Sequence, residues 1–343
     1  MIRVRGRVRS LGLPTVWGAA AVTYKLACPL AQQTDLPARI LTSAVFFAVG
    51  TGLILHVRSS LTRELRQLRR VAGAAQSALL RTPPSRVAGF DVAAAQLSAE
   101  RGAAIGGDLY EVVATEHGVR AVMGDVRGHG IGALGTVAAV LGCFREAAHD
   151  EKELGGVLRR LERALHRHLR QEHPNGDIEE FVTLLLVEIR ADGEILALNC
   201  GHPWPYRLGG AEVAHLSAGD PHPPLGLFPL PDTDLPSAGL GCLRPGEGLF
   251  LYTDGALDAR DGRGRFFPLP AVLESAVREE PYSSQSVLGR VCAALRHHTR
   301  GEPQDDIALL VLTNGRCATA GDAARHASGH VSPAPGDTPL APR

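Results

Sequence analysis

The sequence predicts an α+β body in which layers of helix and strand stack on one another, behind an apolar N-terminal segment. Candidate strands come in groups and candidate helices in pairs, which differs from the strict strand–helix alternation of a parallel α/β sheet. The first 70 residues stand apart because they are rich in Arg, nearly free of acidic residues and contain two apolar stretches. A chain of 343 residues allows one large domain or two smaller units.

The two apolar stretches cover residues 11–31 and 36–57, and each approaches the roughly 20 residues that span a bilayer as a helix. Arg residues precede the first stretch and follow the second, whereas the connector 32–35 carries no Lys or Arg. The positive-inside rule then predicts a membrane hairpin over residues 1–57, in a multi-pass protein of the cell membrane with both termini cytoplasmic. A signal peptide is the alternative, which the second stretch and its basic flank disfavour.

Residues 58–84 are predicted to form a linker helix that ends at a Pro-Pro pair. Apolar residues recur along it at spacings of four and three, a pattern typical of a coiled coil. This stripe consists of Leu61, Leu65, Leu68, Ala72, Ala75 and Leu79. The pattern leaves two roles open: pairing with a second copy in a homodimer, or packing of the helix on its own domain.

Residues 85–314 are predicted to form the globular body. Strands are expected at residues 89–96, 109–114, 119–124, 181–189, 194–200, 248–253 and 307–312. Helices are expected at about residues 132–148, 151–172, 268–279 and 284–299. The tail 315–343 is dominated by Ala, Gly, Pro, Ser and His without an apolar period, and is predicted to be disordered.

Composition disfavours nucleic acid as a partner. The formal net charge is zero and only 5% of residues are aromatic, so no basic face outweighs the acidic residues. The six cysteines form no C-x-x-C pair, which indicates reduced thiols rather than a disulfide framework. The glycines of residues 102–107 lack both a Walker lysine and the G-x-G-x-x-G spacing, so a nucleotide-binding loop is not supported.

Four short acidic motifs, at residues 106–108, 124–130, 252–255 and 305–307, stand at the ends of predicted strands. Their carboxylates belong to Asp108, Asp125, Asp254 and Asp305, and Val126 would add a backbone carbonyl. Oxygen ligands of this kind are the ones that Mg²⁺ and Mn²⁺ prefer. Ions held in this way can activate water for attack on phosphorus. An Asp beside a Gly is often only a turn, but four such motifs at strand ends favour a shared site.

Two histidines near predicted strand ends have two possible roles each. His129, in the glycine-rich turn after Asp125, either braces the turn or ligates a metal, and the preference of hard ions for oxygen favours bracing. His202, in the Gly-His-Pro turn, either acts as a general acid or braces the turn, with bracing again favoured.

The order of motifs resembles that of the RsbU/SpoIIE-type bacterial serine phosphatases, within the metal-dependent type 2C (PPM) phosphatase superfamily. The matching motifs lie at residues 99–113, 122–130, 181–187, 199–205, 224–227, 243–260 and 305–312. The resemblance covers roughly residues 70–313. It implies an α+β fold of the PPM type, a four-layer αββα sandwich preceded here by the transmembrane hairpin, with two Mn²⁺ or Mg²⁺ ions in a cleft.

By motif, the resemblance implies that Asp125 bridges both ions with help from the Val126 carbonyl. Asp108 and Asp254 complete the pair, and these three aspartates form the catalytic set. Asp305 would hold the other side of one ion. Water would attack the phosphoserine directly, with no phosphoenzyme.

Two neighbours of the predicted ligands are also of interest. Arg127 occupies a place that is usually small in the family, and its guanidinium could contact the substrate phosphate. Asp306 adjoins the predicted ligand Asp305. We expect it to contact the metal's ligands at best, and not to bind the metal itself.

The resemblance implies a membrane-anchored phosphatase that acts on a phosphoserine or phosphothreonine protein. In this family the usual substrate is an anti-anti-sigma (STAS) factor, whose dephosphorylation controls a sigma factor. The alternative is a non-catalytic membrane scaffold that binds a regulatory partner, against which the intact carboxylates argue.

Overall fold

The computed structural model describes residue 23 and residues 36–97, 106–128, 131–172, 180–209, 212–231, 233–278, 282–301 and 303–316. The chain divides into two compact units, Met1–Val71 and Ala72–Arg343. The boundary falls inside the long helix α2 (Leu36–Leu79). The second predicted apolar stretch and most of the predicted linker therefore belong to one continuous helix.

In the first unit, the segment Ala44–Glu64 is long and apolar enough to cross a membrane, with a mean hydropathy of 1.5 and no buried part. It is the one such helix among the residues that the structure describes. This finding alone does not establish a membrane hairpin, because residues 11–31 lie, apart from Thr23, outside the described residues. The side chains of Leu65, Leu68, Ala72 and Ala75 in the predicted coiled-coil stripe also lie outside them.

The second unit contains two antiparallel sheets. The six-stranded sheet has the order β1-β2-β11-β10-β7-β8. Its strands are β1 (Arg86–Val87), β2 (Phe90–Leu97), β7 (Tyr206–Gly209), β8 (Glu212–His215), β10 (Gly248–Tyr252) and β11 (Ile307–Asn314). The five-stranded sheet has the order β3-β4-β5-β6-β9. Its strands are β3 (Asp108–Thr115), β4 (Gly118–Val126), β5 (Val182–Ile189), β6 (Glu194–Cys200) and β9 (Ala238–Cys242).

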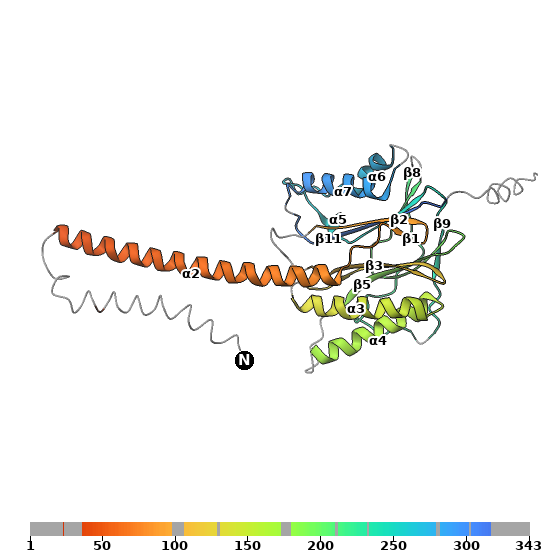
Figure 1. Cartoon of the computed structure of the whole chain (residues 1–343), viewed down its shortest axis with the longest axis horizontal. Coiled ribbons are helices and arrows are strands. Elements are labelled where there is room, and N and C mark those ends of the chain that lie inside the picture. Colours follow the sequence, from red (N-terminus) through yellow and green to blue (C-terminus); the bar gives the residue numbers. More distant parts are fainter. Residues whose placement is uncertain are drawn as a thin grey trace, which may run out of the picture. The chain divides into compact units, whose positions relative to one another are not determined.

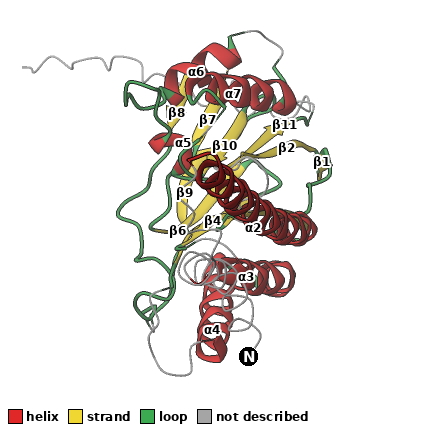
Figure 2. Cartoon of the chain, turned by 90° about the vertical axis from the view of Figure 1, so that its left-hand side faces the viewer, coloured by secondary structure: helices red, strands yellow, loops and turns green. Residues whose placement is uncertain are grey.

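Two pairs of helices cover the outer faces of these sheets (Figure 1). The five-stranded sheet is covered by α3 (Ile131–Asp150) and α4 (Leu154–Glu172). The six-stranded sheet is covered by α6 (Leu269–Val277) and α7 (Ser284–His298). Figure 2 shows the same order of helix, strand, strand and helix from a second direction. The predicted α+β fold of stacked layers is confirmed.

Three hydrophobic clusters fill the spaces between the layers. Strand alternation produces them, because successive side chains of a strand point to opposite faces. In β5, Leu184 and Leu186 pack under α3 and α4, whereas Leu185 packs between the sheets. In β11, Leu309 packs under α6 and α7, whereas Leu310 packs between the sheets. Central strands are thus buried on both faces, and their ends are fixed firmly in place.

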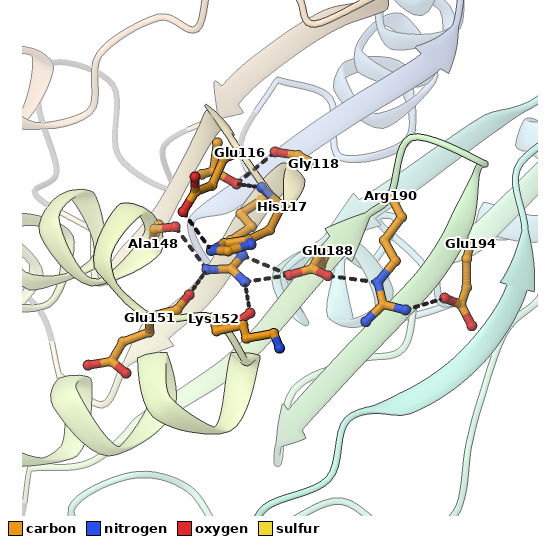
Figure 3. Close-up of polar contacts among 11 residues, drawn as sticks. Glu116, His117, Gly118, Ala148, Glu151, Lys152, Glu188, Arg190 and Glu194 are labelled. Carbon is orange, nitrogen blue, oxygen red and sulfur yellow. Dashed lines mark hydrogen bonds and ion pairs between the residues drawn. The ribbon is translucent and has the colours of Figure 1, made fainter.

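A buried arginine ties the junction of α3 and α4 to the five-stranded sheet. Arg120, in β4, is fully buried, and its guanidinium donates hydrogen bonds of 2.8 and 2.6 Å to one carboxylate oxygen of Glu188. It also donates to the backbone carbonyls of Ala148, Glu151 and Lys152 at the end of α3 (Figure 3). The last carbonyls of a helix have no partners inside it, so Arg120 satisfies groups that burial would otherwise leave unpaired.

Candidate metal centre

Strand register places the first two predicted ligands opposite each other. Asp108 begins β3, Asp125 lies next to the end of β4, and the two residues are direct partners in the antiparallel ladder. Directly opposed residues point to the same face, with Cβ atoms about 4.5–5.5 Å apart. The β3–β4 hairpin therefore holds both carboxylates on one side at one end of the five-stranded sheet.

The other sheet supplies the remaining acidic motifs. Asp254 follows β10, Asp305 and Asp306 precede β11, and β10 and β11 are neighbouring strands with Tyr252 opposite Leu309. The end of one strand and the start of its antiparallel neighbour meet at the same sheet edge. All four sequence motifs consequently lie at strand ends, two in each sheet.

A hydroxyl group joins the two sheets at this edge. Thr253, fully buried after β10, donates a hydrogen bond of 3.1 Å from Oγ1 to Oδ2 of Asp108. The same Oγ1 accepts a hydrogen bond of 2.9 Å from the backbone N–H of Ala308 in β11. Thr253 therefore orients the Asp108 carboxylate from the opposite sheet.

The carboxylates raise one another's pKa. Burial raises the pKa of Asp108 well above its usual value, and the charges of Asp125, Asp306 and Asp254 raise it further. Burial, followed by the charges of Asp254, Asp305 and Asp306, raises the pKa of Asp125 to about 7. Burial and the charge of Asp305 also raise the pKa of Asp254. Coupling across both sheets shows that these groups share one electrostatic environment, which a cation would stabilise.

The donor chemistry of this edge fits hard divalent cations. All the predicted donors are oxygen atoms, as Mg²⁺ and Mn²⁺ prefer. A Cβ on Gly107 would lie 2.8 Å from Oδ1 of Asp125 and would collide with the Val126 carbonyl oxygen, so only glycine keeps these two oxygens accessible. Among the described residues, no three His, Cys, Asp or Glu side chains converge tightly enough to form a ready-made metal cage. The fit therefore rests on donor type and electrostatic coupling.

Asp306 lies nearer to the centre than the sequence indicated. A Cβ on Gly106 would lie 2.6 Å from Oδ2 of Asp306, and the charge of Asp306 raises the pKa of both Asp108 and Asp125. Asp305 is exposed and acts on Asp125 and Asp254 instead. Both members of the Asp-Asp pair thus influence the centre, and their adjacency was the only signal for Asp306 in the sequence.

His202 braces the turn that follows β6. It is buried, and its Nε2 lies 3.1 Å from the Tyr252 carbonyl oxygen, which can only accept, so Nε2 carries the proton. Its Nδ1 lies 3.2 Å from the hydroxyl of Thr183, and Thr183 is the ladder partner of Asp125 in β5. Burial lowers the pKa of His202 to about 3. Both ring nitrogens are engaged within the protein, which favours bracing over proton donation; His129 lies outside the described residues.

Arg127 lies just beyond the end of β4, two residues after Asp125. Its backbone N–H donates a hydrogen bond of 2.9 Å to the Phe181 carbonyl, which fixes the chain as it leaves the strand. Its exposed guanidinium lies 5.3 Å from the centroid of the Phe181 ring. A cation is therefore held beside the predicted ligands.

Comparison with known families gives one match. The profile of the family described as stage II sporulation protein E (SpoIIE) matches residues 115–314, which is more than half of the chain. The matched segment contains Asp125, Val126, Arg127, Asp254 and Asp305, whereas Asp108 lies before it. A search of curated proteins finds no match.

Solved structures share this fold. The SiaA-PP2C domain of Pseudomonas aeruginosa has a TM-score of 0.58 and 20% identity, over 74% of this chain and 98% of that one. The RsbU and RsbW domains of a Mycobacterium tuberculosis protein have a TM-score of 0.51 and 24% identity, over 66% and 60%. The PP2C phosphatase domain with a regulatory fragment of SpoIIE from Bacillus subtilis has a TM-score of 0.51 and 14% identity, over 65% and 62%. The chain thus spans less than two thirds of the last two structures.

Proposed function

The chain belongs to the SpoIIE family of RsbU/SpoIIE-type PPM phosphatases, and from this premise we propose that it is a membrane-anchored, metal-dependent protein serine/threonine phosphatase. The proposed substrate is a phosphoserine or phosphothreonine protein, an anti-anti-sigma factor of the STAS type. Removal of its phosphate would control the activity of a sigma factor.

The observation that carries this proposal is the meeting of acidic residues from both sheets. Asp108 and Asp125 are direct ladder partners, and their pKa values respond to Asp254 and Asp306 from the other sheet. An isolated turn aspartate would show no such coupling. Four carboxylates held together by the backbone of two sheets are a strong reason to expect cations between them.

In the proposed centre, Asp108, Asp125, Asp254 and Asp305, with the Val126 carbonyl, hold two Mn²⁺ or Mg²⁺ ions. When bound, such a pair supplies an activated water and neutralises charge on the phosphoryl group. Thr253 holds the Asp108 carboxylate in one orientation. Arg127 binds a phosphate oxygen of the substrate through its guanidinium, a charge-assisted contact that orients the phosphorus towards the aspartates.

The proposed anchor is the apolar segment Ala44–Glu64 of α2, together with the predicted first span at residues 11–31. Two such spans would leave both termini, and the phosphatase body, on the cytoplasmic side. The predicted linker stripe would allow a homodimer. This arrangement supports regulation of a cytoplasmic phosphoprotein from the membrane surface.

One experiment tests the proposal: phosphate release from a phosphoserine STAS protein by membrane and soluble fractions of cells that express the full chain. We expect Mn²⁺-dependent activity that sediments with membranes, withstands a high-salt wash and is released by detergent. Asp125→Asn should lower kcat by at least about 10³-fold, because it removes a charge from the cation site. Asp192→Asn, at an exposed turn, is the matched control and should retain activity.

Each part of the proposal can be contradicted by a separate result. Absence of turnover by folded protein with Mn²⁺ bound would favour the non-catalytic scaffold. Activity that survives chelation, or that Asp125→Asn leaves intact, would contradict the metal centre. Activity found only in the soluble fraction would contradict the anchor, and turnover of other phosphoproteins but not STAS proteins would contradict the substrate assignment.

A further inference from the structure

A groove between α3 and α4 lies apart from the predicted metal centre. It has a volume of about 580 Å³, which is within the size range of small-ligand sites. None of the predicted ligand residues lines it. Its α3 wall consists of the small residues Ala139, Gly142 and Cys143 together with Glu146, and its α4 wall carries cations.

The cations lie along one side of α4. Arg160, Arg163 and Arg167 recur at spacings of three and four, so they share one face, and His168 adjoins them. Seven residues of helix cover about 10 Å, from a rise of 1.5 Å per residue. The opposite face of α4 is apolar and packs on the sheet. The groove therefore presents a row of positive charge about two helical turns long.

Two of these arginines have no partner among the residues that the structure describes. Arg160 forms an ion pair of 2.7 Å with Asp150 and lies 4.0 Å from Glu146, whereas Arg163 and Arg167 make no hydrogen bond or ion pair with the residues that the structure describes. Like charges four residues apart destabilise an isolated helix by about 0.2–0.5 kcal/mol. A solvated helix face normally intersperses acidic residues, and Glu146 is the one acid among the described lining residues. An external anion therefore explains Arg163 and Arg167 better than a solvated helix face does.

The small α3 residues give that anion room beside the helix. A Cβ on Gly142 would meet nothing within 4 Å, so open space lies over this turn of α3. At Gly135, by contrast, a Cβ would lie 3.2 Å from the His168 imidazole, so this glycine allows the ring to pack against α3. The groove is open over Gly142 and bounded by His168 at the Gly135 turn.

Cys143 also lines the groove. Its thiol is half-buried in the groove, and although burial raises its pKa, the charges of Arg160, Arg167 and Arg163 act in the opposite direction. The three arginines line the same groove as the thiol. An anion bound by them would cover it.

We infer that the α3–α4 groove is a second, non-catalytic binding site for a small ligand with a polyphosphate group. Tetrahedral phosphates offer oxygens in several directions and suit converging arginine forks better than one planar carboxylate does. Arg160 is already paired with Asp150, but Arg163 and Arg167 lie about 6 Å apart along the helix axis, which suits linked phosphates better than a single one. No Phe, Tyr or Trp side chain is found among the described lining residues, so the proposal assigns recognition to the phosphate groups rather than to a nucleobase.

The test is calorimetric titration of the full chain in neutral detergent at physiological salt, with a chelator present so that the phosphatase centre stays metal-free. The probes are inorganic tripolyphosphate and ATP. We expect both to bind with similar Kd values. Arg163→Gln/Arg167→Gln should weaken binding at least about tenfold, because two charge-assisted contacts are lost. Arg170→Gln/Arg278→Gln removes the same charge from exposed positions outside the groove and should change Kd less than about twofold.

A second readout uses the unmodified protein. Alkylation of Cys143 by the uncharged reagent iodoacetamide, followed by mass spectrometry of its peptide, should slow with the same dependence on tripolyphosphate as the calorimetric signal. Tighter binding of ATP than of tripolyphosphate would also support the site and would identify a nucleotide, rather than a free polyphosphate, as its ligand. Absence of binding at millimolar probe, equal weakening in both double variants, or unprotected Cys143 would each overturn the assignment. Because no turnover is measured, failure here leaves the proposed phosphatase activity unaffected.

Discussion

At the scale of single residues, Thr253 links the predicted metal ligand Asp108 to the backbone of β11. Its hydroxyl donates to the Asp108 carboxylate of the centre and accepts from the backbone of the neighbouring strand. Groups that orient metal ligands in this way commonly affect metal affinity about 10–100-fold. The position of Asp108 thus depends on a residue that is not itself a predicted ligand.

Thr253→Val should lower the affinity for Mn²⁺ at least about tenfold, because the Asp108 carboxylate loses its orienting donor. It should also lower the free energy of unfolding by about 1–3 kcal/mol, since the buried N–H of Ala308 is left without an acceptor. Calorimetry and urea denaturation measure the two effects. Thr253→Ser keeps the hydroxyl and serves as the control; if it behaves like the valine variant, the hydroxyl is not responsible.

His202 gives the protein a pH dependence that can be isolated by difference. Burial lowers its pKa to about 3, so the folded protein keeps it neutral while the unfolded chain protonates it below about 6.5. Its stabilising contribution is complete above pH 6.5 and is lost as the pH falls towards 3. Between pH 6 and pH 4, the unfolding free energy of the wild type should therefore fall more steeply than that of His202→Gln. The difference in slope should approach 1.4 kcal/mol per pH unit, about the cost of one bound proton. Equal slopes in urea denaturation would show that His202 titrates normally.

The sequence located most of the candidate centre because its motifs combine carboxylates with glycines at strand ends. Asp108, Asp125 and Asp254 lie at such ends in the structure, and Gly107 keeps two oxygens accessible. Thr253 escaped notice because a hydroxyl beside an aspartate carries no pattern of its own. The contribution of Asp306 depends on how the chain enters β11, which adjacency in sequence cannot decide.

At the scale of elements, Arg120 explains how α3 is held over its sheet. One guanidinium satisfies a carboxylate and the last carbonyls of the helix, in a fully buried place. Because α3 begins a few residues after Asp125, the same strand that carries Asp125 also fixes the far end of this helix. The position of α3 is therefore tied to β4 at both ends.

Arg120→Met should lower the free energy of unfolding by about 3–5 kcal/mol, because the buried Glu188 keeps only the partly exposed Arg190 as a partner and several carbonyls lose their donor. Urea denaturation measures this loss. The double variant Arg120→Met/Glu188→Met should recover part of it, since no unpaired charge remains. A double variant that is less stable than the single one would show that the buried charge is not the cause.

Elements with a strong apolar period were predictable, and weak ones were not. The helices α3, α4, α6 and α7 and the central strands β4, β5 and β11 lie within a few residues of their predicted bounds. The short strands β7, β8 and β9 were missed, because strands of four or five residues carry little alternation and their pairing comes from the tertiary fold. The Gly-rich β9 is an example, with alternating exposed residues.

The pairing of strands into two sheets also could not be predicted from the sequence pattern of the strands. β2 pairs with β11, from opposite ends of the folded unit, and β1 adjoins β2. Contacts between segments so distant in sequence leave no local pattern, since each strand alone is only an apolar run. The resemblance to a known family implied this arrangement, and the periodicity of the strands did not.

At the scale of the whole molecule, an apolar cluster fills the space between the two sheets, and the acidic edge brings carboxylates of both sheets together. There, burial and, after it, the charges of neighbouring carboxylates raise the pKa values of Asp108, Asp125 and Asp254. Divalent cations at this edge would therefore connect β3 and β4 to β10 and β11. The central claim is that these four strand ends form one binding centre.

Calorimetric titration of Mn²⁺ into the full chain at neutral pH tests this claim most directly. We predict that the wild type binds two ions, and that Asp125→Asn, which removes the carboxylate proposed to bridge them, abolishes the binding of at least one. Asp192→Asn should bind as the wild type does. A wild-type chain that takes up no Mn²⁺, or an Asp125→Asn variant that binds two ions with unchanged affinity, would contradict the account.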